Sequence, residues 1–450
     1  MKKYFGTDGI RGIANKDMTS EFACEVAKAG GYILSKEHDN KKKVLIAKDT
    51  RISGDMLENA MASGFLSMGM NVESIGIAPT PVLAYLVKKE NADFGLVISA
   101  SHNPYEYNGI KFFSHKGTKI SDTIEGEIEK QIDFPEYEEN INESDIGKFK
   151  ENTELVNEYV KFIKNNFYED INKNMKEDFV VGIDTANGAT YKLAEEIFKE
   201  LNIRYKIINN TPNGKNINKN CGSTNLEELK KLVIENKLNL GIAYDGDGDR
   251  CLAVDENGKE INGDIILAVF SRYMKEKNKL NNNTLVCTIM SNLALEETSK
   301  QNNIKLIQTG VGDRYVLEEM QKNNYNLGGE QSGHIILSDY NLTGDGILTS
   351  LFLIKIILEK GIQTSKVCSI IDVYPQVLIN IRVKNYKFEQ DKEICEKIEQ
   401  IKKEQNDNCK ILIRPSGTEP VLRVMLEGKD MKYINEKAEE LAQIIEQKLN

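Results

Sequence analysis

The chain has 450 residues, 40% of them hydrophobic and 28% charged, and a formal net charge of −10 at pH 7. At roughly 100–200 residues per domain, this length predicts three or four globular domains. The acidic balance argues against a nucleic-acid partner, because proteins that bind nucleic acid usually present a net basic face. Seven cysteines without CxxC spacing, and an opening segment without an apolar core, predict reduced thiols in a cytoplasmic protein.

Three consecutive segments repeat one order of elements, in which an apolar β-rich run leads through a loop into an amphipathic helix. This alternation is typical of α/β units around a mostly parallel sheet. The first segment predicts strands at 43–49, 72–77 and 94–100 and helices at 54–68 and 81–91. The second predicts strands at 179–184, 203–208 and 240–245 and helices at 190–201 and 225–237. The third predicts strands at 284–290, 305–310 and 326–330, a helix from Asn292 and another at 313–323.

Other stretches separate and end these units. The acidic stretch 134–145 lacks apolar periodicity and predicts a linker after the first domain. The apolar stretch 347–358 is too short to span a bilayer, so it predicts a buried helix and no membrane partner. After it, a strand at 375–383, a helix at 389–404, two β-rich runs and a last amphipathic helix predict an antiparallel sheet.

The predicted fold class is therefore α/β, with three similar mixed-sheet α/β domains plus a smaller C-terminal α+β domain. The predicted domains are 1–150 with a serine loop, 151–253 with a metal-binding loop, 254–366 with a sugar-binding loop and 367–450 with a phosphate-binding loop. In each of the first three, the last strand runs into an unusual loop: SASHNP, DGDGDR and GEQSGH. Ligands of open α/β sheets bind at the carboxyl ends of strands, so these loops predict one shared site.

The loop DGDGDR at 245–250 predicts a metal site. Its glycines let the backbone bend, so that Asp245, Asp247 and Asp249 can turn toward one point. Three crowded carboxylates repel one another unless a hard cation such as Mg²⁺ or Ca²⁺ lies between them. An EF-hand loop would also place Glu256 at its twelfth position, but its sixth position must be glycine and is Arg250 here. A surface acidic turn is the remaining alternative.

Two further loops carry candidate catalytic and binding side chains. Ser101 follows an apolar strand and is expected to be exposed and positioned, as a nucleophile, a phosphate ligand or part of a turn. The chain has no GxSxG and no GxxxxGK[ST], so a hydrolase elbow and a P-loop are unsupported. The loop side chains suited to sugar hydroxyls or proton transfer are His102, Glu330, Ser332 and His334.

The loop RPSGTEP at 414–420 predicts a phosphate cradle, since guanidinium, hydroxyl and backbone N–H groups bind phosphate. Its candidate ligands are Arg414, Ser416, Gly417 and Thr418, with Arg423 as a second guanidinium. The chain prefers lysine elsewhere, yet five arginines lie in or beside its glycine-rich stretches: Arg11, Arg250, Arg314, Arg414 and Arg423. Phosphate binding would account for this placement, and the alternatives are chance and structural ion pairing.

Together these loops resemble the α-D-phosphohexomutase superfamily. The matching stretches follow in order over the whole chain: FGTDGIRG at 5–12, ISASHNP at 98–104, NGIKFF at 108–113, DGDGDR at 245–250, GEQSGH at 329–334 and RPSGTEP at 414–420. The resemblance implies four domains around a central cleft, and a phosphoryl group carried by Ser101. It also implies one Mg²⁺ per chain, held by a phosphoserine oxygen and Asp245, Asp247 and Asp249.

The resemblance implies roles for the remaining candidates. Arg11, Lys111 and Arg250 would surround the transferring phosphoryl group, with His102 in the same catalytic set. Glu330, Ser332 and His334 would contact the sugar. The other phosphate would be held by Arg414, Ser416, Gly417, Thr418 and Arg423. The partner would be a small sugar phosphate, and a homodimer would agree with the resemblance.

Within the superfamily the chain resembles most the members that act on aminosugars. The stretches that carry this resemblance are FGTDGIRG, DTRISG at 49–54, GVGDRYV at 310–316 and Gln331. The implied reaction interconverts glucosamine 6-phosphate and glucosamine 1-phosphate through a sugar 1,6-bisphosphate and feeds UDP-N-acetylglucosamine synthesis. The alternative is a phosphomannomutase/phosphoglucomutase, a subclass with histidine where this chain has Asp313. A non-catalytic sugar-phosphate sensor and a metal-dependent phosphatase are rivals from other classes.

Overall fold

The computed structural model describes residues 3–6, 8–35, 43–137, 144–384, 386–404, 409–415 and 421–449. The chain forms two compact units, the first with residues 1–290 and 304–370 and the second with residues 291–303 and 371–450. Three sheets lie in the first unit and a fourth in the second. In the described part of the chain, no helix is both long and apolar enough to cross a membrane.

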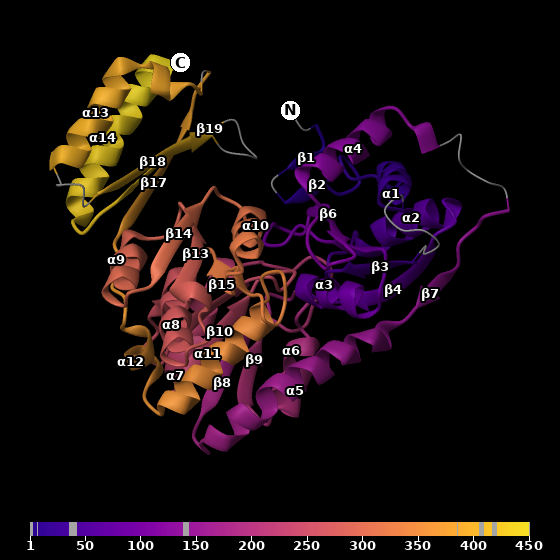
Figure 1. The fold of residues 1–450 in the computed structure, drawn as a ribbon, viewed down its shortest axis with the longest axis horizontal. Coiled ribbons are helices and arrows are strands. Elements are labelled where there is room, and N and C mark those ends of the chain that lie inside the picture. The colour runs from indigo at the N-terminus through magenta and orange to yellow at the C-terminus, as the bar shows by residue number, and fades with distance from the viewer. Residues whose placement is uncertain are drawn as a thin grey trace. The chain divides into compact units, whose positions relative to one another are not determined.

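The first sheet has seven strands in the order β1-β2-β6-β5-β3-β4-β7. They are β1 (Phe5–Gly6), β2 (Gly9–Ile13), β3 (Lys43–Lys48), β4 (Asn71–Ile77), β5 (Phe94–Ile98), β6 (Tyr107–Ser114) and β7 (Phe149–Glu151). The helices α1 (Ser20–Ser35), α2 (Gly54–Ser67) and α4 (Asp122–Asp133) cover one face, and α3 (Thr80–Lys89) covers the other (Figure 1). Since both faces are covered, β5 and the middle of β3, residues 44–47, are apolar and buried.

The second sheet has the order β12-β11-β10-β8-β9. Its strands are β8 (Val180–Asp184), β9 (Arg204–Ile208), β10 (Leu240–Tyr244), β11 (Cys251–Asp255) and β12 (Glu260–Ile261). The helices of this segment are α5 (Asn157–Asn174), α6 (Leu193–Glu200) and α7 (Glu227–Asn236). β10 and β11 pair antiparallel with Tyr244 opposite Cys251, so the DGDGDR loop is the connection of a hairpin.

The third sheet has the order β14-β13-β15-β16. Its strands are β13 (Thr284–Thr288), β14 (Lys305–Thr309), β15 (Leu327–Gly329) and β16 (Ile335–Leu337). The helices are α8 (Gly263–Glu276), α10 (Asp313–Asn323), α11 (Gly346–Lys360) and α12 (Thr364–Cys368). α11 contains the apolar stretch 347–358, and most of its side chains are buried, as the sequence predicts.

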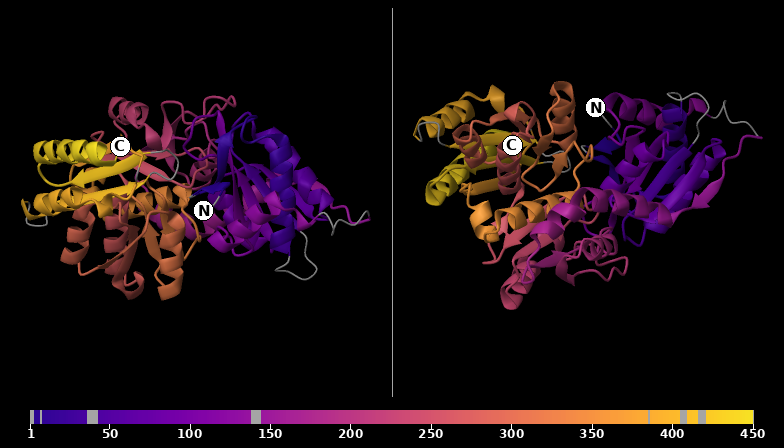
Figure 2. Two further views of the ribbon diagram at one scale, coloured as in Figure 1. Left: turned by 90° about the horizontal axis from the view of Figure 1, so that it is seen from above. Right: turned by 60° about the horizontal axis from the view of Figure 1, so that its bottom comes forward.

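The second unit holds an antiparallel sheet in the order β17-β19-β18. Figure 2 shows this C-terminal part of the chain in orange and yellow. Its elements are β17 (Gln376–Arg382), β18 (Lys410–Pro415), β19 (Val421–Glu427), α9 (Leu293–Gln301), α13 (Lys392–Glu404) and α14 (Met431–Leu449). The helix predicted from Asn292 is α9, but it belongs to this unit rather than to the third sheet. The residue before α9, Asn292, is bound to another segment of this unit, since its Nδ2 donates to Tyr374 O at 2.9 Å. The predicted fold class, three mixed-sheet α/β parts and a small sheet domain, is confirmed.

Candidate active site

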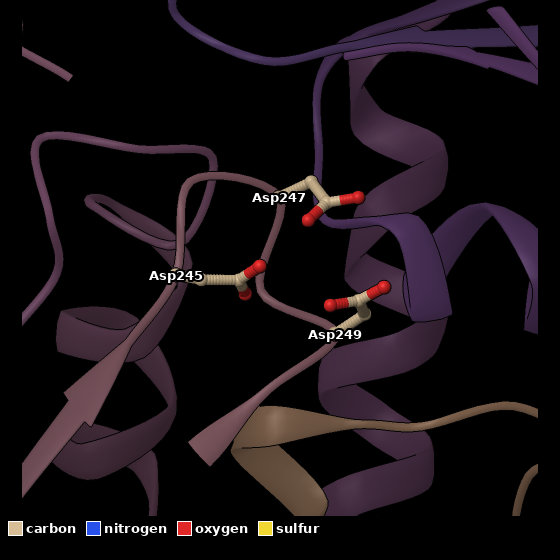
Figure 3. A group of neighbouring side chains, drawn as sticks. All are labelled: Asp245, Asp247 and Asp249. Carbon is tan, nitrogen blue, oxygen red and sulfur yellow. The ribbon is translucent and has the colours of Figure 1, made fainter. Parts of the chain in front are cut away.

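Three aspartates converge in the loop between β10 and β11. Carboxylate oxygens of Asp245, Asp247 and Asp249 lie within 4.8 Å of one another, and the side chains project from a single loop (Figure 3). The two glycines serve different purposes. Gly248 takes a φ of 70°, which bends the loop. Gly246 admits a close neighbour, because a Cβ there would lie 2.5 Å from the carbonyl oxygen of Ser101.

The donor set of this cluster fits a hard cation. All three aspartates are buried, and Asp247 Oδ1 and Asp249 Oδ1 accept no hydrogen bond from the described residues. Burial raises the pKa of Asp245 well above its usual value, and the charges of Asp249 and Asp247 raise it further. Crowded buried carboxylates with unused oxygens are costly without a counter-ion. The three aspartates could therefore hold a metal ion through oxygen ligands.

Ser101 lies directly beside this cluster. It follows β5 and takes a left-handed backbone conformation with a φ of 50°. Its Oγ donates a hydrogen bond to Asp245 Oδ2 at 2.6 Å. The sequence predicts an exposed serine, and this is wrong for the described structure, because Ser101 is only 1% exposed. The aspartate loop packs against the Ser101 carbonyl oxygen at Gly246, so two loops that are distant in sequence meet at this serine.

Lys111 supplies a buried positive charge next to the aspartates. Its Nζ on β6 lies 2.9 Å from Asp247 Oδ2, 2.9 Å from Asp8 Oδ2 and 3.7 Å from Asp249 Oδ2. Burial would lower the pKa of Lys111, but Asp247 and Asp8 raise it above its ordinary value. The ammonium group therefore stays protonated and partly balances the carboxylates.

Asp8 is a second carboxylate that contacts Lys111. It forms ion pairs with Arg11, Lys111 and Lys119. Burial opposes ionisation of Asp8, but Lys111, Lys119 and Arg11 hold its pKa well below the usual range. Arg11 Nη1 also donates to Asn103 Oδ1 of the serine loop at 3.3 Å. Sequence reasoning missed Asp8 and Lys119, although Asp8 stands inside the FGTDGIRG motif.

The GEQSGH loop places His334 against the aspartates. His334 Nδ1 lies 3.6 Å from Asp249 Oδ2, and Nε2 lies 3.3 Å from Asp313 Oδ2. Burial raises the pKa of Glu330, and the nearby charge of Asp313 raises it further. Ser332 Oγ is buried and has no hydrogen-bond partner among the described residues. The contact of His334 with Asp249 brings the loops of the second and third sheets together. Within the aspartate loop itself, Arg250 Nε lies 3.8 Å from Asp249 Oδ1.

Comparison with known proteins decides the family. Four domain models match in order: phosphoglucomutase/phosphomannomutase alpha/beta/alpha domain I over residues 2–139, domain II over 157–258, domain III over 262–374 and the C-terminal domain over 378–444. A curated phosphoglucosamine mutase of Acetivibrio thermocellus is 49% identical over 453 residues, which is 100% of each chain. The chain belongs to the α-D-phosphohexomutase superfamily. It is accordingly a mutase, an enzyme of the isomerase class.

Solved structures share the phosphohexomutase fold. A putative phosphomannomutase from Thermus thermophilus superposes with a TM-score of 0.81 at 22% identity, covering 98% of this chain and 100% of the other. An N-acetylphosphoglucosamine mutase of Aspergillus fumigatus, in complex with GlcNAc-6P and magnesium, gives a TM-score of 0.72 at 15% identity and covers 99% and 96%. Both superpositions extend over almost the whole chain, so they support the fold class independently of the sequence motifs in the loops.

The last phosphohexomutase domain holds the candidate phosphate ligands. Arg414 on β18 and Arg423 on β19 are direct partners across the antiparallel pair, so both side chains stand on the same face of this sheet. Two facing guanidinium groups suit an anion. The other predicted ligands, Ser416, Gly417 and Thr418, lie outside the described residues.

Arg314 does not join the phosphate ligands. It forms ion pairs with Asp122 and, at 2.5 Å, with Glu125 Oε1, both on α4. Glu125 is 2% exposed, so this arginine satisfies a buried carboxylate. The alternative of structural ion pairing is therefore the correct one for Arg314.

His102 is held in its neutral form. Burial and the positive charges of Arg250 and Arg11 lower the pKa of His102 to about 4. At about pH 6 to 8 the ring is therefore uncharged, and it offers only hydrogen bonds such as the 3.4 Å contact of Nδ1 with Ser101 Oγ. We expect kcat to show the same pH profile in this range for wild type and His102→Gln. An inflection that disappears in His102→Gln would contradict this expectation.

Proposed function

We propose that this chain is a phosphoglucosamine mutase, which reversibly converts glucosamine 6-phosphate to glucosamine 1-phosphate and so supplies UDP-N-acetylglucosamine synthesis. The observation that carries the proposal is the hydrogen bond of 2.6 Å between Ser101 Oγ and Asp245 in a buried triple-aspartate cluster. It combines a candidate phosphoryl carrier with a candidate metal site. The full-length identity of 49% to a curated phosphoglucosamine mutase supports the aminosugar substrate.

The proposed reaction has two phosphoryl transfers. In the first, the bond between Ser101 Oγ and phosphorus breaks while a free hydroxyl oxygen of the sugar monophosphate bonds to phosphorus, and the proton of that hydroxyl passes in net terms to Ser101 Oγ. This yields the 1,6-bisphosphate and free Ser101. In the second, Ser101 Oγ bonds to the other phosphorus of the turned bisphosphate, the bond from that phosphorus to the sugar oxygen breaks, and the serine proton passes in net terms to that oxygen, so the isomeric monophosphate leaves. Catalysis of this kind rests chiefly on positioning and charge stabilisation.

The residues around Ser101 are suited to these tasks. Asp245, Asp247 and Asp249, with a phosphoserine oxygen, would hold one Mg²⁺, which would draw negative charge from the phosphoryl oxygens. Lys111, fixed between Asp8 and Asp247, keeps a positive charge beside the aspartate cluster. Arg11 and Arg250 add guanidinium groups at the edges of the same cluster.

Substrate binding is assigned to the remaining loops. Glu330, Ser332 and His334 would contact the sugar, and Ser332 Oγ is buried without a partner among the described residues, as a ligand group would be. Arg414, Arg423 and the loop residues Ser416, Gly417 and Thr418 would hold the phosphate that is not transferred. The cytoplasmic location, a homodimer and the domain limits 1–150, 151–253, 254–366 and 367–450 stay predictions.

A coupled assay tests the substrate class. With Mg²⁺ and a trace of sugar 1,6-bisphosphate, we expect glucosamine 6-phosphate to give a higher kcat/KM than glucose 6-phosphate or mannose 6-phosphate. The reverse order would favour the phosphomannomutase/phosphoglucomutase alternative. Release of inorganic phosphate without isomer formation would instead indicate a phosphatase.

A further inference from the structure

Arg51 of the DTRISG motif holds the serine loop through hydrogen bonds to its backbone. Arg51 is 3% exposed, and its guanidinium lies against the backbone of 101–107. Its Nη2 donates to the carbonyl oxygens of Ser101 at 2.9 Å and Asn103 at 2.8 Å. Its Nη1 donates to the carbonyl oxygens of Tyr107 at 3.0 Å and Pro104. One side chain therefore binds four carbonyl groups of the loop that carries the nucleophile.

Asp49 fixes this arginine and the start of the same loop. Its Oδ2 accepts from Arg51 Nε at 2.8 Å and from Ser99 Oγ at 2.6 Å. Ser99 Oγ in turn accepts from the backbone N–H of Ser101 at 2.9 Å. The N–H and the carbonyl of Ser101 are thus both tied, directly or through one side chain, to the Asp49–Arg51 ion pair.

Asn218 reaches the serine loop from the second domain. Its Nδ2 donates to the carbonyl oxygens of Ser101 at 2.8 Å and Asn103 at 3.1 Å. Its own backbone N–H donates to Ala186 O at 2.9 Å, so the loop of the second domain holds it in place. Gly246 of the aspartate loop leaves room for this contact, because a Cβ there would lie 2.8 Å from Asn218 Nδ2.

The carbonyl of Ser101 therefore accepts hydrogen bonds from two domains. Arg51 belongs to the first domain and Asn218 to the second, which also carries the three aspartates. Ser101 itself holds a left-handed backbone that a serine rarely adopts unaided. These donors oppose relaxation of that backbone and keep its Oγ directed at Asp245.

We propose that Arg51 and Asn218 are positioning residues for phosphoryl transfer. They hold the Ser101 backbone so that its Oγ stays beside Asp245 of the aspartate loop. This inference rests on the proposed function, because it assigns the two residues to the reaction of Ser101. Neither side chain is assigned a contact with substrate. Their loss misplaces the nucleophile and lowers kcat, while the sugar-binding and phosphate-binding loops keep their affinity for the substrate.

The decisive variant is Asn218→Gly. Asn218 has a φ of 57°, which glycine adopts freely, so this change removes the amide without straining the backbone. The matched control is Asn220→Gly, because Asn220 lies in the same loop with a φ of 56° and is exposed. We expect Asn218→Gly to lower kcat by about 10- to 100-fold with KM within about twofold, since displacement by 1 Å can cost about 100-fold. Asn220→Gly is expected to match wild type.

Arg51→Lys extends the test to the first domain. Lysine keeps a positive charge for Asp49 but lacks the planar fork that reaches four carbonyl groups, so kcat is expected to fall without a matching rise in KM. Equal kcat in Asn218→Gly, Arg51→Lys and wild type would overturn the proposal, as would a loss confined to KM.

A second measurement does not depend on turnover. Hydrogen–deuterium exchange of peptides covering 99–107 is expected to be faster in Asn218→Gly than in Asn220→Gly. If wild type fails to isomerise any hexose phosphate, the proposed function fails, yet faster exchange would still show that Asn218 holds this loop. If exchange in Asn218→Gly equals that in Asn220→Gly, Asn218 does not hold the serine loop, and this conclusion does not depend on the substrate.

Discussion

Ser101→Ala is expected to abolish isomerisation of glucosamine phosphate while leaving substrate binding nearly unchanged. The alanine removes the Oγ that would carry the phosphoryl group, and no other described hydroxyl is hydrogen-bonded to Asp245. Loss of a nucleophile that forms a covalent intermediate typically costs about four orders of magnitude or more in kcat. The coupled assay measures the loss, and isothermal titration with glucosamine 6-phosphate measures the binding.

Ser67→Ala is a suitable control for this variant. Ser67 ends α2, and its Oγ donates only to the backbone carbonyl of Gly64, at 2.7 Å, so turnover is expected to stay at the wild-type level. Turnover of Ser101→Ala at a comparable level would show that phosphoryl transfer does not pass through this serine.

Removal of the divalent cation is expected to stop turnover just as completely. Chelation would leave three buried carboxylates with Lys111 as the closest neutralising group, and addition of Mg²⁺ is expected to restore activity. Asp247→Asn is expected to raise the Mg²⁺ concentration for half-maximal activity by at least about 10- to 100-fold. Loss of a residue that is only hydrogen-bonded to a metal ligand already lowers metal affinity by about this factor. A titration of activity against Mg²⁺ measures both effects.

Asp55→Asn provides the matched aspartate control. Asp55 lies on α2 with its side chain 82% exposed, and it contacts Lys48 rather than the cluster. Its Mg²⁺ dependence is expected to equal that of wild type. Full activity of the chelated enzyme would show that the reaction needs no divalent cation. Unchanged Mg²⁺ dependence of Asp247→Asn would show that Asp247 does not bind it.

The fold could be predicted from sequence because its signals are local. Strands buried on both faces give unbroken apolar runs, so the run at 43–49 predicted β3 (Lys43–Lys48) almost to the residue. The same holds for the clustering of Asp245, Asp247 and Asp249, which lie within one loop. The helix α9 shows the limit of this reasoning, since its pattern predicted a helix but could not say which sheet it joins.

The missed residues depend on contacts between distant parts of the chain. Asn218 binds a carbonyl 117 positions away, and Lys119 pairs with Asp8 across 111 positions. A lone asparagine or lysine in a polar loop carries no periodicity that would reveal such a partner. Arg314 shows the converse error, since a guanidinium beside a glycine-rich loop looks the same in sequence whether it binds phosphate or Glu125.

The most direct test follows the phosphoryl group itself. Enzyme radiolabelled on Ser101 is mixed with excess unlabelled glucosamine 6-phosphate, and samples are quenched at intervals shorter than one turnover. We predict that the label leaves Ser101 within the first turnover and appears in the sugar bisphosphate and then in the sugar monophosphates. Label that stays on the protein through many turnovers, or that leaves only as inorganic phosphate, would contradict the phosphoserine mechanism.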